Sequence, residues 1–81
     1  IELYPNPVGD YLYVEFRVEL SESAVISLYD VSGKVLTNYK GSHLYKDVLE
    51  LKTSHLKPGI YFIKVTDIDT DTRFTGKVIK R

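Results

Sequence analysis

The amino-acid sequence predicts an all-β protein, a sandwich of six or seven short antiparallel strands. Apolar residues alternate with polar ones at a period of two, and no segment carries an apolar helical stripe longer than about two turns. Strand-like segments recur every ~8 to 12 residues with turn residues between them, which is typical of a sandwich or barrel. At 81 residues the chain supports one core, so residues 1–81 are expected to form a single domain.

The first half of the chain predicts a strand and then a hairpin. Residues 11–20 alternate strictly, which predicts a half-buried strand. After a polar break at residues 21–23, the alternation resumes and predicts a hairpin over residues 24–40. The hairpin turn has Asp30 in its first position and Gly33 in its fourth, the preference of a type I turn whose last residue needs a positive φ.

The second half predicts three more strands, at residues 48–51, 60–65 and 74–80. Tyr61 lies two residues after the Pro58-Gly59 turn, at the start of a strand. A tyrosine corner occupies this position in immunoglobulin-like sandwiches, where its hydroxyl bonds to the backbone a few residues upstream. The sequence therefore predicts an immunoglobulin-like arrangement with a buried Tyr61.

The composition argues against several classes of function. Eleven basic and eleven acidic residues give a net charge of zero, so no nucleic-acid partner is expected. The chain has no cysteine, which removes disulfides and thiol nucleophiles from consideration. His43 and His55 each lie beside a serine in a polar turn, with no pattern that would build a catalytic triad. We therefore expect no enzyme activity and no cofactor.

An acidic alternation, Asp67, Asp69 and Asp71, resembles the opening ligands of a calcium loop. The rest of that loop does not follow, because Thr72 stands where the sharp turn needs Gly and Val78 where a bidentate Glu is required. The three carboxylates are expected to solvate the tip of a hairpin on one polar face. No metal site is predicted.

The chain ends in a basic segment. Residues 72–81 contain Arg73, Lys77, Lys80 and Arg81 and no acid. Lysines on an edge strand protect it from aggregation, and a basic terminal strand can also be presented to a receptor. Charge alone favours protection of the edge strand.

Four stretches of the chain together resemble a known family. They are Tyr4-Pro5-Asn6-Pro7-Val8, Tyr29-Asp30-Val31-Ser32-Gly33-Lys34-Val35, Leu56-Lys57-Pro58-Gly59-Ile60-Tyr61 and Gly76-Lys77-Val78-Ile79-Lys80-Arg81. In this order and spacing, across essentially the whole chain, they resemble the C-terminal sorting domain (type A) of proteins exported by the type IX secretion system of Bacteroidota. The resemblance implies an immunoglobulin-like sandwich, in agreement with the strand pattern.

The resemblance also implies a function. Such domains are the C-terminal part of secreted proteins, carry an N-terminal cargo domain through the periplasm and the outer-membrane translocon, and are then removed by a sortase-like cysteine peptidase. The expected partners are this cargo, the translocon with its shuttle components, and the peptidase. The expected destination is the outer-membrane surface or the medium, and the chain is expected to be a piece excised from a larger secreted protein.

The site residues that the resemblance implies fall in those four stretches. They are Pro5, Asn6, Pro7, Asp30, Gly33, Gly59, Tyr61, Lys77, Lys80 and Arg81. The prolines are expected before the first strand, and the glycines in turns. The final strand is the best candidate for recognition, because it is basic, terminal and expected at an edge where a receptor could pair with it.

An accessory module is the alternative function. An immunoglobulin-like or fibronectin-like domain of this size could bind carbohydrate or pack beside a neighbouring domain, with exposed rings at Tyr11, Tyr13 and Tyr29. Cross-strand packing also explains such rings without any ligand.

Short edge strands would in addition allow two isolated copies to pair as a dimer.

Overall fold

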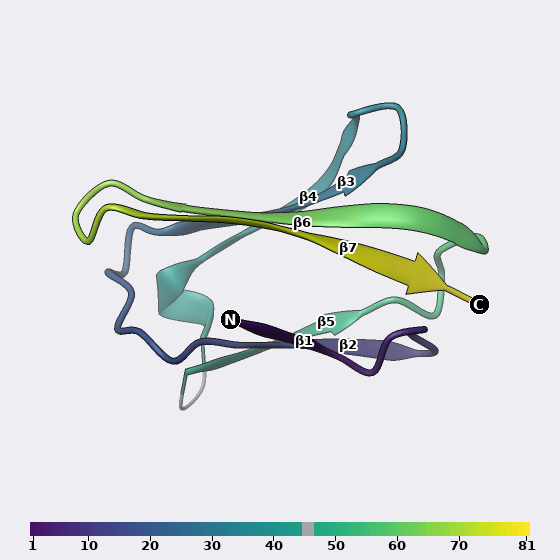
Figure 1. The fold of residues 1–81 in the computed structure, drawn as a ribbon, viewed down its shortest axis with the longest axis horizontal. Coiled ribbons are helices and arrows are strands. Elements are labelled where there is room, and N and C mark those ends of the chain that lie inside the picture. The colour runs from purple at the N-terminus through teal and green to yellow at the C-terminus, as the bar shows by residue number, and fades with distance from the viewer. Residues whose placement is uncertain (45–46) are drawn as a thin grey trace.

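The protein is a sandwich of two antiparallel sheets, seen in a computed structural model that describes residues 1–44 and 47–81 (Figure 1). Its strands are β1 (Glu2–Tyr4), β2 (Tyr11–Glu15), β3 (Val25–Asp30), β4 (Val35–Lys40), β5 (Val48–Lys52), β6 (Gly59–Asp67) and β7 (Thr72–Lys80). A single turn of 3₁₀ helix, η1 (Gly41–His43), follows β4. The predicted sandwich of six or seven strands is confirmed.

The chain crosses between the sheets three times. One sheet has the strand order β1-β2-β5 and the other has the order β4-β3-β6-β7, with every pairing antiparallel. The β3–β4 hairpin bends away from β6 and β7, and from the three-stranded sheet beyond them (Figure 1). A register shift between Leu28 and Tyr29 accompanies this bend, as expected where an extra residue enters one strand of a pair.

The core is built from the alternating apolar positions of both sheets. Buried side chains come from β2, β3, β5, β6 and β7, together with Val8 from the connection between β1 and β2 and Phe16 directly after β2. Tyr61, Ile63 and Val65 face this core from β6, as the alternation predicts, and Phe62 and Lys64 point to the opposite face. Each sheet therefore has one apolar inner face and one outer face.

Two strand predictions differ from the structure. The strand expected over residues 11–20 ends at Glu15, where the Phe16 amide donates to the Asp47 carbonyl oxygen at 2.9 Å and the chain leaves the sheet. A three-residue strand, β1, was not predicted, because three residues are too few to show a period of two. Within the described residues, no helix has the length and apolar character needed to cross a membrane.

Candidate recognition site

The Pro5-Asn6-Pro7 segment lies along the outer edge of the last strand. The Asn6 side chain acts there like a short strand, because its Nδ2 donates to the Lys77 carbonyl oxygen at 3.2 Å and its Oδ1 accepts from the Ile79 amide at 2.9 Å. Val8 continues the pairing, donating to the Ile79 carbonyl oxygen and accepting from the Arg81 amide. The N-terminal motif is thereby joined to the C-terminal end of the chain.

The prediction that the prolines precede the first strand is wrong. β1 comes before them, and the segment connects β1 to β2. A connection suits prolines because a residue without an amide proton cannot contribute a donor to a ladder. The Tyr4-Pro5 and Asn6-Pro7 peptide bonds are both cis.

β7 is an edge strand, as expected, but its edge is divided into two parts. Backbone groups of alternate residues point outward from β7, and those of Lys77, Ile79 and Arg81 are the ones that meet Asn6 and Val8. The stretch around Arg73 and Thr75 forms the free part, since no strand of the described chain pairs with it on this side. The edge that remains open for an added strand is thus the beginning of β7.

The central motif forms the predicted turn between β3 and β4. Asp30 Oδ1 accepts from the amides of Ser32 and Lys34 and from the Ser32 hydroxyl, and Gly33 has a φ of 87°. The hydrogen bond from the Ser32 hydroxyl, followed by that from the Lys34 amide, holds the pKa of Asp30 below its usual value. Asp30 therefore organises its own turn as an ionised side chain.

Tyr61 makes the predicted tyrosine corner. Its hydroxyl donates to the Lys57 carbonyl oxygen at 2.6 Å, four residues upstream, and its side chain is buried. Gly59, at the start of the same strand, has a φ of 154°, in the region that favours glycine. This motif fixes the entry into β6 next to the end of β7.

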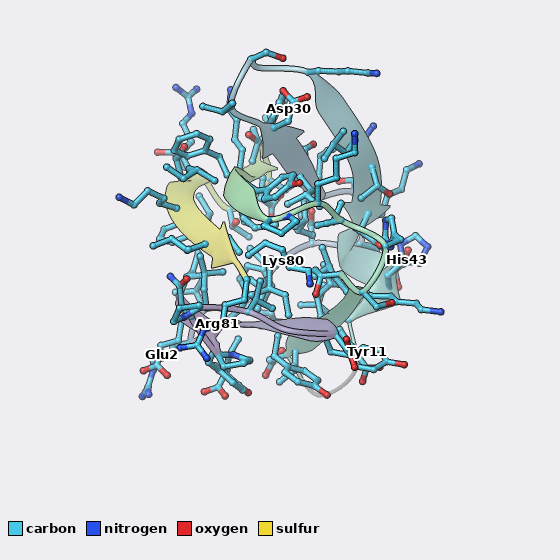
Figure 2. The ribbon with its side chains drawn as sticks, turned by 90° about the vertical axis from the view of Figure 1, so that its right-hand side faces the viewer. Glu2, Tyr11, Asp30, His43, Lys80 and Arg81 are labelled. Carbon is cyan, nitrogen blue, oxygen red and sulfur yellow. The ribbon has the colours of Figure 1, made fainter. Side chains whose placement is uncertain are left out.

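Strand register brings all four motifs to one end of the four-stranded sheet. Asp30 pairs with Tyr61, Tyr61 pairs with Val78, and Gly59 pairs with Lys80. The N-terminal segment then continues this arrangement outward from β7. Figure 2, which views the molecule from this end, shows Asp30 on the β3–β4 hairpin and Lys80 and Arg81 nearer the three-stranded sheet.

The three basic residues of the ending do not share a face. Lys77 points to the outer face of the sheet and is exposed, whereas Lys80 alternates to the other side and is half-buried. Arg81 follows the strand and is exposed, and its carbonyl oxygen accepts from Lys80 Nζ at 3.3 Å. A partner on the outer face would therefore meet Lys77 without Lys80.

Sequence reasoning missed a second organised centre, at Asp67. This side chain is 2% exposed, so the expectation that it faces solvent with Asp69 and Asp71 is wrong. Its carboxylate accepts from the Ser21 amide and hydroxyl and from the Thr70 hydroxyl, each at 2.7 Å, and from the Asp69 amide at 3.2 Å. The bond from the Ser21 amide is the largest cause that lowers its pKa from 3.8 to about 2.

The Asp67 centre acts as a clasp, meaning that its hydrogen bonds hold two segments of the chain together. It ties the segment before β3 to the β6–β7 turn, and the Ser23 hydroxyl adds a bond to Asp69 at 3.1 Å. Among the described residues, no group of three or more His, Cys, Asp or Glu side chains is placed to hold a metal ion. Thr70, three residues after Asp67, was the local signal for this turn, but nothing in the sequence pointed to Ser21.

Comparison with known proteins decides the family. The model of the secretion system C-terminal sorting domain matches residues 2–81, nearly the whole chain. The chain belongs to the secretion system C-terminal sorting domain family. Among curated proteins no significant match is found. Membership of this sorting domain family implies export of a protein by a secretion system.

Proposed function

We propose that this sorting domain directs a cargo protein, joined to its N-terminal side, through the type IX outer-membrane translocon. The family match over residues 2–81 is the observation that carries the proposal. The four motifs support it as well, because residues far apart in the chain form one end of one sheet. On this reading the whole chain, residues 1–81, is one sorting domain from a larger secreted protein.

The proposal includes the later steps of export. The domain engages the translocon and its shuttle components in the periplasm, and a sortase-like cysteine peptidase then removes it at the outer-membrane surface. The cargo ends at the surface or in the medium. The domain acts as a substrate in these steps, and its own residues supply binding and shape.

We further propose that the site residues divide into two groups. Asn6, Gly33, Gly59 and Tyr61 hold the end of the sheet in shape, together with Pro5, Pro7 and Asp30. The exposed cations Lys77 and Arg81 contact the export machinery, and Lys80, on the other side of β7 from Lys77, adds positive charge at this end of the chain. Their basic charge suits an acidic receptor surface.

Charge reversal tests this division. The triple variant Lys77→Glu, Lys80→Glu, Arg81→Glu should block export of a fused reporter, while circular dichroism and the unfolding midpoint stay close to those of the wild type. The matched control is Lys52→Glu, which reverses an exposed lysine on the other sheet. Normal export of the folded triple variant would rule out recognition through these cations.

The arrangement of the tyrosine rings argues against the accessory-module alternative. Tyr11 and Tyr13 point outward from the three-stranded sheet, and Tyr29 points outward from the four-stranded sheet, so the three do not form one platform. Tyr13 stacks on Tyr4, with ring centroids 5.6 Å apart, which is the cross-strand packing expected without a ligand.

Position in the fused protein separates the two functions. We expect a periplasmic reporter to be exported when the domain is fused to its C-terminus and retained when the domain is fused to its N-terminus. A carbohydrate-binding module would bind equally well in both positions. Equal export from both fusions would contradict the proposal of a C-terminal sorting signal.

A further inference from the structure

The outer face of the four-stranded sheet is basic. Alternation along β3, β4, β6 and β7 points four cations to this face, and no aspartate or glutamate of these strands points the same way. The cations are Lys40, Lys64, Arg73 and Lys77. This surface therefore attracts negative charge although the chain as a whole is neutral.

The outer face of the three-stranded sheet has the opposite character. Glu2, Glu15 and Glu50 point outward from β1, β2 and β5, with Lys52 among them. Arg17, just beyond β2, forms an ion pair with Glu2 at 2.8 Å. The two outer faces of one sandwich therefore differ in charge, because one carries four cations and the other a small excess of acids.

Apolar side chains gather at one end of the basic face, the end that carries the four motifs. Val35 pairs with Tyr29, and Tyr29 pairs with Phe62, so that three apolar residues form a row across β4, β3 and β6. Ile60 and Ile79 form the next pair and remain 43% and 40% exposed. An exposed apolar group bordered by Lys64 and Lys77 is the kind of surface that can bind another molecule.

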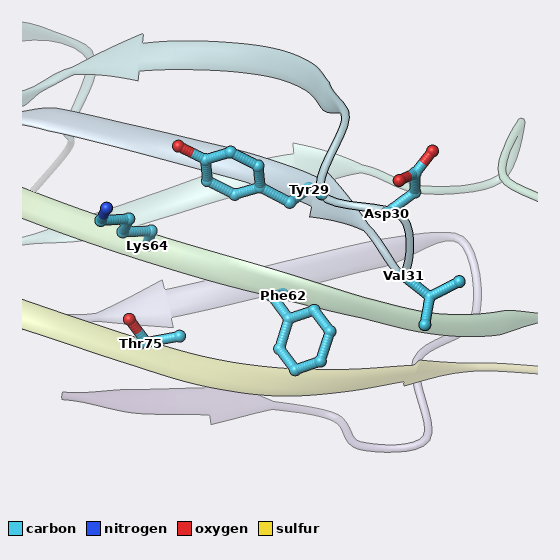
Figure 3. Close-up of a pocket in the computed structure, with 7 residues that line it drawn as sticks. Tyr29, Asp30, Val31, Phe62, Lys64 and Thr75 are labelled. Atoms are coloured by element: carbon cyan, nitrogen blue, oxygen red, sulfur yellow. The ribbon is translucent and has the colours of Figure 1, made fainter.

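A hollow lies in this apolar row, below the bent β3–β4 hairpin. Its volume is about 310 Å³, at the small end of ligand sites, which suits a single large apolar side chain. Figure 3 shows the rings of Tyr29 and Phe62 with Lys64 and Thr75 around it. Val31, at the hairpin tip, adds an apolar wall that is 73% exposed.

The polar groups of the hollow are free to bind. Within residues 1–44 and 47–81, the Lys64 ammonium group and the hydroxyls of Tyr29 and Thr75 make no intramolecular hydrogen bond. The acid that lines the hollow, Asp30, uses Oδ1 within its own turn, and its carboxylate points away from Phe62 and Lys64 (Figure 3).

We propose that this hollow is the docking site for an acidic segment of a partner protein. An aromatic or aliphatic side chain of that segment sits between Tyr29 and Phe62, and its carboxylates bind Lys64 and, further along the same face, Lys77. Charge complementarity selects this occupant, because a neutral sugar would leave the surrounding cations without a counter-charge. That the partner is part of the export machinery rests on the proposed function.

A titration of the isolated domain tests the docking site. The probe is a short synthetic peptide in which phenylalanine is flanked by glutamates, followed by amide NMR spectra of the ¹⁵N-labelled chain. We expect saturable shifts centred on Tyr29, Phe62, Lys64 and Thr75, and none with the matched peptide in which lysine replaces glutamate. Shifts spread evenly over all basic residues, or no saturable shift, would overturn the proposal.

A pair of lysine variants locates the binding. Lys64→Glu should lower the affinity for the acidic peptide by about tenfold or more. Lys52→Glu, on the acidic face, should leave this affinity unchanged. Lys64→Gln serves the same purpose if the charge-reversed chain does not fold. Equal effects of the changes at residues 64 and 52 would contradict docking in the hollow.

Two further measurements exclude other occupants. Polygalacturonate that binds the hollow while the acidic peptide does not would replace the proposal with an anionic carbohydrate. Self-association in sedimentation velocity that Lys64→Glu abolishes would replace it with the acidic face of a second copy.

Because the titration uses the isolated chain, its result stands whether or not the domain directs export. Normal export of a Lys64→Glu fusion would contradict the role of the hollow in sorting, and failed export of the wild-type fusion would contradict the proposed function itself.

Discussion

Two buried polar side chains, those of Tyr61 and Asp67, hold connecting segments in place against the strands of this small sandwich. Tyr61 holds the turn before β6 through one hydrogen bond to Lys57, and Asp67 holds the segment before β3 through bonds from Ser21. Each side chain is buried, so its polar atoms need these partners inside the protein. The effect of each can be measured by changing a few atoms.

Removing the Tyr61 hydroxyl should weaken the fold while its ring stays in place. We expect Tyr61→Phe to lower the free energy of unfolding by about 1 kcal/mol, because the bond to the Lys57 carbonyl oxygen is lost. Urea denaturation measures the change. The control is Tyr29→Phe, whose hydroxyl has no partner within the described residues. Equal losses in both variants would mean that the corner bond adds nothing.

Asp67 should make the protein sensitive to acid. Its pKa is about 2 when folded and near 3.8 when unfolded, so the unfolded chain binds a proton first as the pH falls. Its stabilising effect is complete above a pH of about 4 and is lost as the pH falls through about 2. Asp67→Asn should therefore have a lower melting temperature near neutral pH and a smaller further loss in this range.

Melting temperatures of both chains across this range give the comparison. The difference in melting temperature between the wild type and Asp67→Asn reports on Asp67 alone. Asp30, whose pKa is also lowered, is present in both chains and affects them alike. A constant difference in melting temperature from neutral pH to a pH of about 2 would contradict the clasp.

At the scale of elements, the last strand is completed by a segment that is not a strand. β7 is held on one side by β6 and on the other by Asn6 and Val8, which cover its C-terminal half. The Pro5-Asn6-Pro7-Val8 segment near the start of the chain and residues 77–81 at its end are therefore one structural unit. The free part of the edge, around Arg73 and Thr75, carries a cation that discourages edge-to-edge pairing.

Loss of the Asn6 side-chain amide should free the C-terminal half of β7 from the segment that covers its edge. We expect Asn6→Ala to accelerate hydrogen exchange of the Ile79 amide by about tenfold, because that amide loses its acceptor. The control is Asn38→Ala, which removes an amide bonded to Ser27 at the other side of the same sheet. Unchanged exchange at Ile79 in Asn6→Ala would show that Val8 alone holds the segment.

The elements differ in how far the sequence predicts them. Alternation predicts β3, β4, β6 and β7, and the turn residues Asp30 and Gly33 lie where type I geometry needs them. The pairing of Asn6 with β7 and of Ser21 with Asp67 joins residues more than 40 positions apart. A local period says which face a residue occupies, but not which distant group it meets, so these bonds could not be predicted.

The whole molecule combines a common core with two different outer faces. The sandwich and its tyrosine corner follow from residue pattern, and the candidate site residues follow from four motifs that the fold brings to one end. The separation into a basic face and an acidic face becomes visible only once the strands are paired, because the residues of each face come from strands that lie far apart in the sequence. A short domain can thus offer an export machinery both a shape and a charge pattern.

The most direct test of the account is surface delivery of an enzymatic reporter that carries a periplasmic export signal and this domain at its C-terminus. The fraction of reporter activity at the cell surface is compared between cells with and without a working type IX translocon. The account predicts surface activity only with the translocon, together with loss of the 9.3 kDa domain from the delivered reporter. Reporter that stays in the periplasm of both strains with its folded domain attached would contradict it.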